Sequence, residues 1–335
     1  MQAAIYGIEG LALKGDERAF LRDAEPAGFI LFRRNCESPD QLLRLTDSLR
    51  GLSGRDDVPI LIDQEGGRVA RMRPPVWPAF PAAEKFAQLY QAAPSSAIEA
   101  VRSNARALAL MLRSAGINVN ALPLLDVRQE GATDIIGDRA LGSEPMQVAA
   151  LGRAVLDGMA SAGVVGIIKH MPGHGRALVD SHKELPVVTA SAEELEVDLE
   201  PFERLAAAPM GMTAHVVYTA WDAERPASLS PVVIQQIIRE RIGFDGFLMS
   251  DDLGMEALTG DFGSRASGAV AAGCDVALHC SGKMDEMIAV AAAVPALTPE
   301  GHERLTRAMA GTRIDFEPVD FAEEIAKRDQ LLALA

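Results

Sequence analysis

The sequence has little cysteine and little positive charge. Its three cysteines, Cys36, Cys274 and Cys280, show no metal-ligand spacing, and their odd number argues against a disulfide framework and favours a reducing compartment. The 32 lysine and arginine residues are scattered and face 47 aspartate and glutamate residues, which gives a net charge of −15. Because phosphate binding needs a basic face, this composition argues against a nucleic-acid partner.

Targeting and linker segments are also missing. The first residues, MQAAIYGIEG, carry no positive region before a cleavable apolar segment, and the apolar runs elsewhere are shorter than a membrane span. No proline-rich linker, low-complexity tract or short-period repeat divides the chain. We therefore expect a cytoplasmic protein with no membrane partner, folded as a single domain over residues 1–335.

Several familiar catalytic motifs are absent as well. The sequence has no GxSxG elbow of a serine hydrolase, no HExxH zinc helix and no GKS or GKT phosphate loop. The segments GIEG and GDRALG are too weak to indicate a dinucleotide site. Apolar residues nevertheless make up 48% of the chain and charged residues 24%, which is the usual balance of a globular protein with a sizeable core.

Short apolar runs alternate with helical patterns along the chain, and the runs predict strands. The predicted strands are 3–9, 28–33, 58–63, 116–126, 164–169, 209–217, 245–250 and 274–280. Helical patterns cover 39–52 after the cap candidate Ser38, 95–114, 147–162, a stretch opened by the capping box of Ser191 and Glu194, and 231–242 after Ser230. This alternation predicts a single (β/α)8 TIM-type barrel with a helical tail from about residue 296, and an open doubly wound sheet is the main alternative.

Polar residues that can take part in catalysis recur where the apolar runs end. They are Arg33, Asn35, Asp63, Glu65, Asp126, Lys169, His170, His215, Asp251, Asp252 and His279. Catalytic groups contributed by the carboxyl ends of many strands are typical of a barrel mouth, whereas an open sheet uses one crevice. The pattern therefore favours the barrel.

The segment KHMPGHGRALVDSH, from Lys169 to His182, holds three of the six histidines. It follows the apolar run VVGII, and the stretch 171–190 has no helical pattern, which indicates a lid or a binding loop. Asp180 and His182 are one residue apart, so in an extended chain they project to the same side. There the carboxylate can orient the imidazole and raise its basicity. We therefore expect an acid or base in this loop.

Other residues of the segment leave alternatives open. Lys169 and His170 are adjacent and should point to opposite sides of a strand, so one of them could be structural. His174 lies between Gly173 and Gly175, which can permit movement, and it fits an exposed loop residue as well as a functional one. A cluster of three histidines and one aspartate could also bind a divalent metal, which is the main rival mechanism. That cluster is His170, His174, His182 and Asp180.

Two further segments carry carboxylates at strand ends. Asp63 begins DQEGGRV, which could be only a tight turn with a surface ion pair, but a carboxylate ending a buried run suits vicinal sugar hydroxyls. Asp251 and Asp252 in FLMSDDLG should splay apart, so that one enters the barrel mouth and the other turns outward or caps a helix. Their spacing does not decide which is which.

Five segments together resemble the glycoside hydrolase family 3 β-N-acetylglucosaminidases of bacterial peptidoglycan recycling. They are DQEGGRVARM, IIGDRALGSEP, KHMPGHGRALVDSH, MTAHVVY and FLMSDDLGMEAL. The resemblance runs from about residue 5 to residue 290, and its KH-PGHG and DSH elements are strongly characteristic. It implies a (β/α)8 barrel standing alone, without the second domain that many members of the family append.

The resemblance also implies roles for individual residues. Asp251 matches the nucleophile that forms a covalent glycosyl-enzyme, His182 matches the general acid/base, and Asp180 matches the carboxylate that orients His182. An imidazole thus replaces one of the two carboxylates usual in retaining glycosidases. The positions matching the sugar ligands of the −1 subsite are Asp63, Arg71, Arg139, Lys169 and His170. Met171 stands where relatives commonly carry phenylalanine, so the loop can pack differently.

The expected function follows from these matches. We expect a monomeric, retaining exo-β-N-acetylglucosaminidase that releases terminal β-linked N-acetylglucosamine from small muropeptide fragments and needs no metal or organic cofactor. A family 3 β-glucosidase is the alternative within the family, but such enzymes typically lack the DSH element. A metal-dependent hydrolase and a non-catalytic sugar-binding barrel are the alternatives from other classes.

Overall fold

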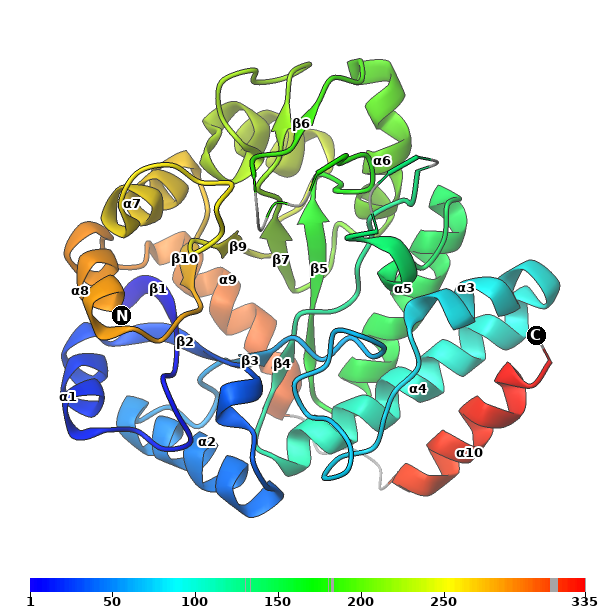
Figure 1. Cartoon of the computed structure of the whole chain (residues 1–335), viewed down its shortest axis with the longest axis horizontal. Helices are drawn as coiled ribbons and strands as arrows, with labels where there is room; N and C mark the ends of the chain where they lie inside the picture. The colour runs from blue at the N-terminus through cyan, green and yellow to red at the C-terminus, as the bar shows by residue number, and fades with distance from the viewer. Residues whose placement is uncertain (130, 133, 180, 182–183, 314–318, 335) are drawn as a thin grey trace.

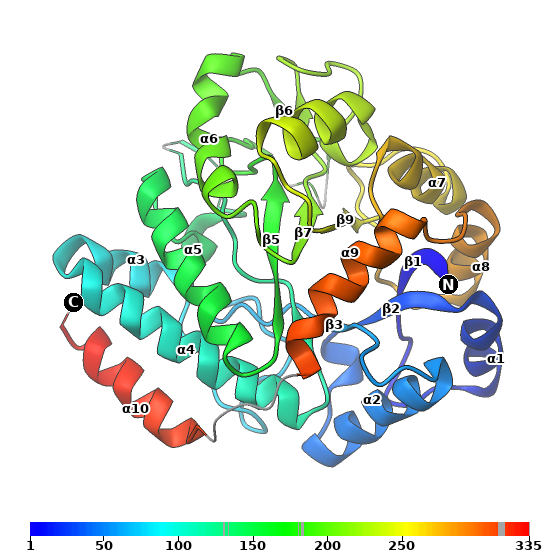
Figure 2. The same cartoon turned by 180° about the vertical axis from the view of Figure 1, so that it is seen from behind.

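Eight parallel strands close into a barrel, surrounded by helices, in the computed structural model of the chain (Figures 1 and 2). The structure describes residues 1–335 except 130, 133, 180, 182–183, 314–318 and 335. The strand order is β1-β10-β9-β7-β5-β4-β3-β2, so strands that follow one another in the barrel pair side by side and the first pairs with the last. The predicted (β/α)8 barrel is confirmed, and the open sheet is wrong.

Each predicted strand overlaps one barrel strand. The barrel strands are β1 (Gln2–Gly7), β2 (Pro26–Leu31), β3 (Ile60–Ile62), β4 (Val119–Asn120), β5 (Val165–Met171), β7 (Met210–Thr213), β9 (Phe247–Asp252) and β10 (Val276–His279). β4 is shorter than predicted because the Asn120 side chain takes over the strand pairing, accepting from Gln64 N at 3.0 Å and donating to Gln64 O at 2.9 Å. The predicted strand 209–217 divides between β7 and β8 (Val217–Tyr218), which pairs with β6 (Val187–Val188) outside the barrel.

The helices lie outside the strands, and the predicted caps form. Ser38 accepts a hydrogen bond from Gln41 N at 3.3 Å, and Ser191 and Glu194 make the reciprocal capping box. The α-helices are α1 (Gly15–Ala24), α2 (Pro39–Ser53), α3 (Ala83–Ala92), α4 (Pro94–Ser114), α5 (Pro145–Ala160), α6 (Ala192–Arg204), α7 (Phe262–Ala272), α8 (Met284–Ala293), α9 (Pro299–Met309) and α10 (Phe321–Leu332). The segment after Ser230 winds as a π-helix over Val233–Arg241, and short 3-10 helices cover Arg33–Asn35, Gly137–Arg139, Ala227–Leu229 and Ala310–Arg313. None of the described helices is long and apolar enough to span a bilayer.

Side chains alternate along each strand between two apolar cores. In β3, Ile60 and Ile62 pack outward against the helices, while Leu61 points into the barrel. The inner core contains Ile5, Ile167 and other side chains contributed by the strands, all almost completely buried. The barrel is therefore a packed core and not a channel.

The helix α9 closes the amino-terminal end of the barrel. Its residues Leu305 and Met309 belong to the inner core, and Figure 2 shows α9 lying across the barrel. Arg304 Nη1 lies 3.1 Å from Oδ1 of Asp275, the residue directly before β10. α10 instead packs along α4, where Arg106 pairs with Glu324 at 3.1 Å. Of the predicted tail, α9 thus covers the amino-terminal end of the barrel, and the carboxyl-terminal end of the barrel remains for a site.

Met171, the last residue of β5, packs into the outer core. It is fully buried, and its backbone oxygen accepts a hydrogen bond from Ala214 N at 2.8 Å. Its terminal methyl group lies over Gly211 in β7, where a Cβ would come within 2.1 Å of Met171 Cε and 2.9 Å of Phe244 Cζ. The flexible methionine side chain therefore occupies space that Gly211 leaves free.

This packing predicts a compensating pair of substitutions. Gly211→Ala should lower the free energy of unfolding by about 1–3 kcal/mol through overpacking, and Met171→Ala should lower it by about 2–5 kcal/mol through a cavity. In the double variant the new methyl group partly fills the cavity, so the loss should fall short of the sum by at least about 0.5 kcal/mol. Urea denaturation of the four proteins measures this coupling, and strictly additive losses would contradict the packing.

Candidate active site

A cavity of about 260 Å³ lies at the carboxyl ends of the barrel strands, at the end opposite α9. This is the end where barrels of this kind carry their functional groups. Apolar lining comes from Phe32, Met212, Met255 and Leu278, among others. The polar and ionisable lining residues are Asp63, Glu65, Arg71, Arg139, Lys169, His170, His174, Ser181, Asp251, Asp252 and Cys280. The structure thus brings the five predicted sugar ligands and the predicted nucleophile Asp251 around one cavity.

Asp63 lies just beyond β3 between two cations. Its Oδ1 is 3.2 Å from Lys169 Nζ and its Oδ2 is 3.1 Å from Arg71 Nη2. Burial would by itself raise the pKa of Asp63, but the charges of Lys169 and Arg71 outweigh burial and hold that pKa below its ordinary value. The guanidinium of Arg71 also lies 5.2 Å from the centre of the Phe32 ring. Asp63 is therefore an ionised acceptor at the cavity wall and not a surface turn residue.

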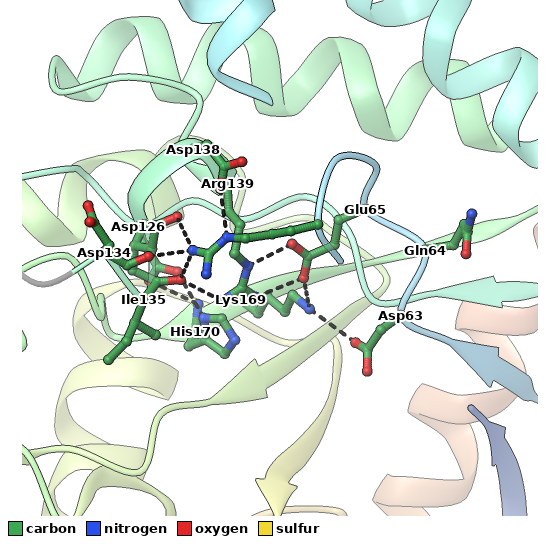
Figure 3. A network of polar contacts seen from close by, with 12 residues as sticks. Asp63, Gln64, Glu65, Asp126, Asp134, Ile135, Asp138, Arg139, Lys169 and His170 are labelled. Atoms are coloured by element: carbon green, nitrogen blue, oxygen red, sulfur yellow. Dashed lines mark hydrogen bonds and ion pairs between the residues drawn. The ribbon is translucent and has the colours of Figure 1, made fainter. Parts of the chain in front are cut away.

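Glu65 joins two of the cations that line the cavity (Figure 3). Its carboxylate accepts two hydrogen bonds from Arg139, Nε to Oε2 and Nη2 to Oε1, both at 2.8 Å, and Lys169 Nζ lies 2.7 Å from Oε1. Burial acts to raise the pKa of Glu65, yet Lys169 and Arg139 lower it to about 2. The side chains of Lys169 and Glu65 are only 3% and 5% exposed, so each charge depends on its partners.

His170 is held by a buried aspartate. Asp126 accepts from His170 Nδ1 at 2.8 Å and from the backbone N–H groups of His170 at 3.1 Å and His174 at 2.7 Å. Although burial acts to raise the pKa of Asp126, these contacts lower it to about 2. The contact with Asp126 leaves Nε2 of His170 for other partners.

The side chains of Lys169 and His170 both line the cavity, so the expectation that they point to opposite sides is wrong. That expectation assumed the regular alternation of an extended strand. The peptide bond between the two residues is cis, and the pairing of β5 with β7 shifts register between Ile168 and Met171. Both residues are thus available to one ligand.

The adjacent carboxylates at the end of β9 have different surroundings. Asp252 Oδ1 accepts from the backbone N–H groups of Gly254 at 3.0 Å and Cys280 at 3.2 Å, which ties it to the loop and to the next strand. Asp251 Oδ1 accepts only from Asp252 N, at 2.8 Å, among the described residues. Burial acts to raise the pKa of Asp251, but His170 and His215 shift the net pKa below its ordinary value. Asp251 is therefore the ionised carboxylate with the fewer internal hydrogen bonds.

The predicted dyad of Asp180 and His182 lies outside the described residues. Ser181, which stands between them in the sequence, lines the cavity. Its backbone oxygen accepts from Ala257 N at 3.2 Å, and its Oγ lies 3.3 Å from His174 Nε2. The loop that joins β5 to β6, residues 172–186, thus reaches the same cavity as Asp251.

The middle of this β5–β6 loop is packed more tightly than an exposed loop. His174 is 3% exposed, so the alternative of an exposed histidine is wrong, and burial lowers its pKa to about 4. Added Cβ atoms would lie 2.9 Å from Asp198 Cβ at Gly173 and 1.8 Å from Val127 O at Gly175. Both glycines therefore serve close backbone contact, because any larger residue would collide there.

Sequence reasoning named Glu65, Asp126 and His215 among the polar residues at strand ends but assigned none of them an individual role. Their contacts join residues far apart in the chain, and no local pattern reports such pairs. His215 is buried between Ser228 Oγ at 2.5 Å and the backbone oxygen of Asp252 at 2.9 Å, so it supports the loop after β9.

The alternative of a metal site finds no support among the described residues, because they contain no group of three possible metal ligands. Two of the ligands proposed for that site, Asp180 and His182, lie outside the described residues.

Comparisons with known proteins agree with this geometry. Residues 4–310 match the model of the glycosyl hydrolase family 3 N-terminal domain. A β-hexosaminidase of Methylococcus capsulatus is 40% identical over 83% of this chain and 82% of its own, and one of Alkalilimnicola ehrlichii is 39% identical over 90% and 87%. The structure of NagZ from Neisseria gonorrhoeae in complex with N-trifluoroacetyl-D-glucosamine superposes with a TM-score of 0.86, with 31% identity over 99% of this chain and 98% of that one.

The Glu65 network predicts a pH-dependent loss of stability. Glu65→Gln should lower the free energy of unfolding at pH 7 by about 3 kcal/mol, because it leaves buried cations uncompensated. The native pKa of about 2, against 4.5 for an ordinary glutamate, means that the stabilisation is complete above pH 4.5 and is lost as the pH falls through 2. Urea denaturation between pH 3 and pH 7 should therefore show the two proteins converging in acid.

Glu84→Gln is the matched control. Glu84 pairs with Arg128 at 3.1 Å, but both side chains are more than 40% exposed, so its loss should cost less than about 0.5 kcal/mol. Equal losses for the two variants, or a Glu65→Gln loss that does not shrink in acid, would contradict the network.

Proposed function

The chain is a β-hexosaminidase that belongs to glycosyl hydrolase family 3, and from that premise we propose that it is a retaining exo-β-N-acetylglucosaminidase. The main support for this proposal is the cavity. Its lining contains the ionised Asp251, which accepts few hydrogen bonds, together with several ion-paired side chains and part of the β5–β6 loop. In this proposal Asp251 is the nucleophile, His182 is the general acid/base and Asp180 orients His182. Asp63, Arg71, Arg139, Lys169 and His170 bind the sugar.

The choice of Asp251 as nucleophile over Asp252 rests on hydrogen bonds. A carboxylate that must attack carbon needs an ionised oxygen that is not already fully engaged. Asp252 Oδ1 is engaged by two backbone donors, whereas Asp251 Oδ1 receives one and its carboxylate lines the cavity. The lowered pKa of Asp251 keeps it ionised at neutral pH.

The paired charges around the cavity suit a neutral ligand rich in hydroxyl groups. Asp63 and Glu65 supply acceptors, and Arg71, Arg139 and Lys169 supply donors, and each of these groups already makes an ion pair with a neighbour. Two buried donor or acceptor positions, Arg71 Nε and His174 Nδ1, have no partner among the described residues. A cavity of about 260 Å³ holds a single sugar ring better than a longer chain, which supports exo action.

The reaction then proceeds in two steps. Asp251 attacks the anomeric carbon while His182 gives a proton to the departing glycosidic oxygen, which forms a glycosyl-enzyme and releases the rest of the substrate. His182, now neutral, takes a proton from water as the water attacks the same carbon and frees Asp251. Two inversions leave the configuration of the sugar unchanged.

We further propose that the substrates are fragments of peptidoglycan, such as anhydromuramyl peptides that carry a terminal β-linked N-acetylglucosamine. The NagZ relative was crystallised with an N-acylglucosamine analogue, which supports recognition of this sugar. Three free thiols suit the reducing cytoplasm as the place of action. The proposal includes a monomeric enzyme that uses no metal.

Replacing the proposed catalytic residues should give two different kinetic results. Asp251→Ala should abolish turnover of every substrate, because no covalent intermediate can form. His182→Ala should lower kcat/KM about 10²- to 10⁴-fold for substrates with poor leaving groups, but much less for an activated aryl leaving group, which departs without a proton. Steady-state kinetics on a series of aryl N-acetylglucosaminides measures this contrast. Near-normal activity of Asp251→Ala would contradict the proposal.

Substrate choice and metal dependence are tested in one further experiment. The protein should hydrolyse aryl N-acetyl-β-glucosaminide faster than the matching aryl β-glucoside, and exhaustive chelation should leave the rate unchanged. Preference for the glucoside would favour a β-glucosidase, and loss of activity that returns with a divalent metal would favour a metal-dependent hydrolase. No turnover of either substrate would favour a non-catalytic sugar-binding barrel.

A further inference from the structure

Arg176 connects the β5–β6 loop to helix α6. Its Nε lies 2.5 Å from Asp198 Oδ2, and its Nη2 donates to the backbone oxygen of Glu194 at 2.8 Å. Asp198 and Glu194 are four residues apart on α6, so the guanidinium of Arg176 binds two positions that lie about one helical turn apart. The Asp198 side chain is 1% exposed and that of Arg176 is 22% exposed, which makes this contact far less screened than a surface ion pair.

The residues just before Arg176 are also held by contacts with other segments of the protein. The hydroxyl of Tyr218, in β8, donates to Gly173 O at 2.7 Å, and Asp126 accepts from His174 N at 2.7 Å. Gly173 and Gly175 pack so closely against α6 and Val127 that neither position has space for a Cβ. Arg176 is therefore the last charged anchor of a tightly held segment, and four residues later the chain reaches Asp180.

We infer that Arg176 and Asp198 are positioning residues for the proposed acid/base His182, because they fix the part of the β5–β6 loop that precedes Asp180 in the sequence. The inference rests on the proposed function, because it assigns the two residues an effect on His182 and none on the nucleophile. Neither residue lines the cavity. Their influence passes through the backbone of the loop, so it should affect only the step that needs proton transfer.

The surroundings of Asp198 make this tether sensitive to pH. Its Oδ1 has no partner among the described residues, and burial, helped by the charge of Asp126, raises its pKa to about 6 although Arg176 opposes the rise. The groups that face it are Arg176 from the loop, Asp126 from the segment after β4, and Tyr218 from β8, whose own pKa is raised so that it stays neutral. Below pH 6 a protonated Asp198 still accepts a hydrogen bond from the charged Arg176, but the ion pair is lost and the contact is weaker.

The first test is the dependence of kcat/KM on the leaving group. Arg176→Ala should lower kcat/KM about 10- to 100-fold for a substrate with a poor leaving group, which is part of the proton-transfer contribution. It should change kcat/KM less than about threefold for an activated aryl N-acetylglucosaminide. Arg176→Lys should fall in between, because a lysine can reach Asp198 but cannot also bond the helix carbonyl. Equal losses on both substrates would overturn the inference, since they would indicate a purely structural effect.

Arg241→Ala is the matched control for α6 itself. Arg241 binds the same helix from another side, through Glu196 and through Glu203 at 2.7 Å, and it makes no ion pair with the described residues of the loop. Removing it should leave the leaving-group dependence unchanged. A dependence like that of Arg176→Ala would mean that any loosening of α6 has this effect, and would overturn the specific assignment to Arg176.

The second test is the pH profile of kcat/KM with the poor leaving group. This parameter reports the steps through glycosyl-enzyme formation, for which Asp251 must be ionised and His182 protonated. The pKa of Asp251 is below its ordinary value, so an acidic limb near pH 6 is expected from Asp198 instead. Asp198→Asn should lower activity at pH 7 to the level of the acidic limb and abolish the decline between pH 7 and pH 5. A variant that keeps the wild-type limb would overturn the inference.

The variant His182→Ala distinguishes a failure of the proposed function from a failure of the positioning inference. If His182→Ala shows no selective loss on poor leaving groups, the proposed acid/base is wrong. If His182→Ala shows that loss and Arg176→Ala does not, the proposed function stands and only the positioning inference fails.

Discussion

The cavity depends on the burial of one ammonium group. Lys169 Nζ has almost no access to water, and it remains charged because Asp63 and Glu65 lie within 3.2 Å and 2.7 Å. Those carboxylates in turn keep their charge because Arg71 and Arg139 bind their other sides. Removing Glu65 would leave the buried Arg139 without its ion-pair partner, which costs more than the pair contributes. The proposed sugar-binding groups are thus held in place by their ion pairs with one another.

The barrel explains why such a balance can exist. Its inner core is apolar and closed at one end by α9, so polar side chains can gather only at the carboxyl ends of the strands. There Asp63, Lys169 and Asp251 arrive from three strands that are far apart in the sequence. Rigid strand ends keep these charges close without the entropy that flexible loops would lose on ordering. The same geometry fixes the electrostatic setting of Asp251, which is surrounded by imidazoles and by Lys169.

Much of the fold, and part of the site, could be predicted from local sequence patterns. Strand ends located Asp63, Lys169 and Asp251, because an apolar run that stops at a charged residue is visible in the sequence. Pairings between distant segments were not visible, such as Asp126 with His170, 44 positions apart. Local rules also failed where the backbone departs from regular geometry, as at the cis peptide bond after Lys169. Gly173 and Gly175 look like hinge residues in sequence, but their lack of a side chain serves packing.

The two kinds of catalytic group that the proposal needs have different structural requirements. A nucleophile must meet one carbon along one line, and the proposed nucleophile Asp251 lies on a strand, with its carboxylate fixed by the next backbone N–H. The acid/base must serve two oxygens in turn, the departing glycosidic oxygen and the attacking water, so a loop is a suitable carrier. A loop alone would make proton transfer imprecise. Here residues 173–176 are tightly packed, and Arg176 is bonded to α6, so the loop is fixed up to four residues before Asp180. In the proposal, the acid/base is therefore carried by a loop whose preceding segment is held by a helix.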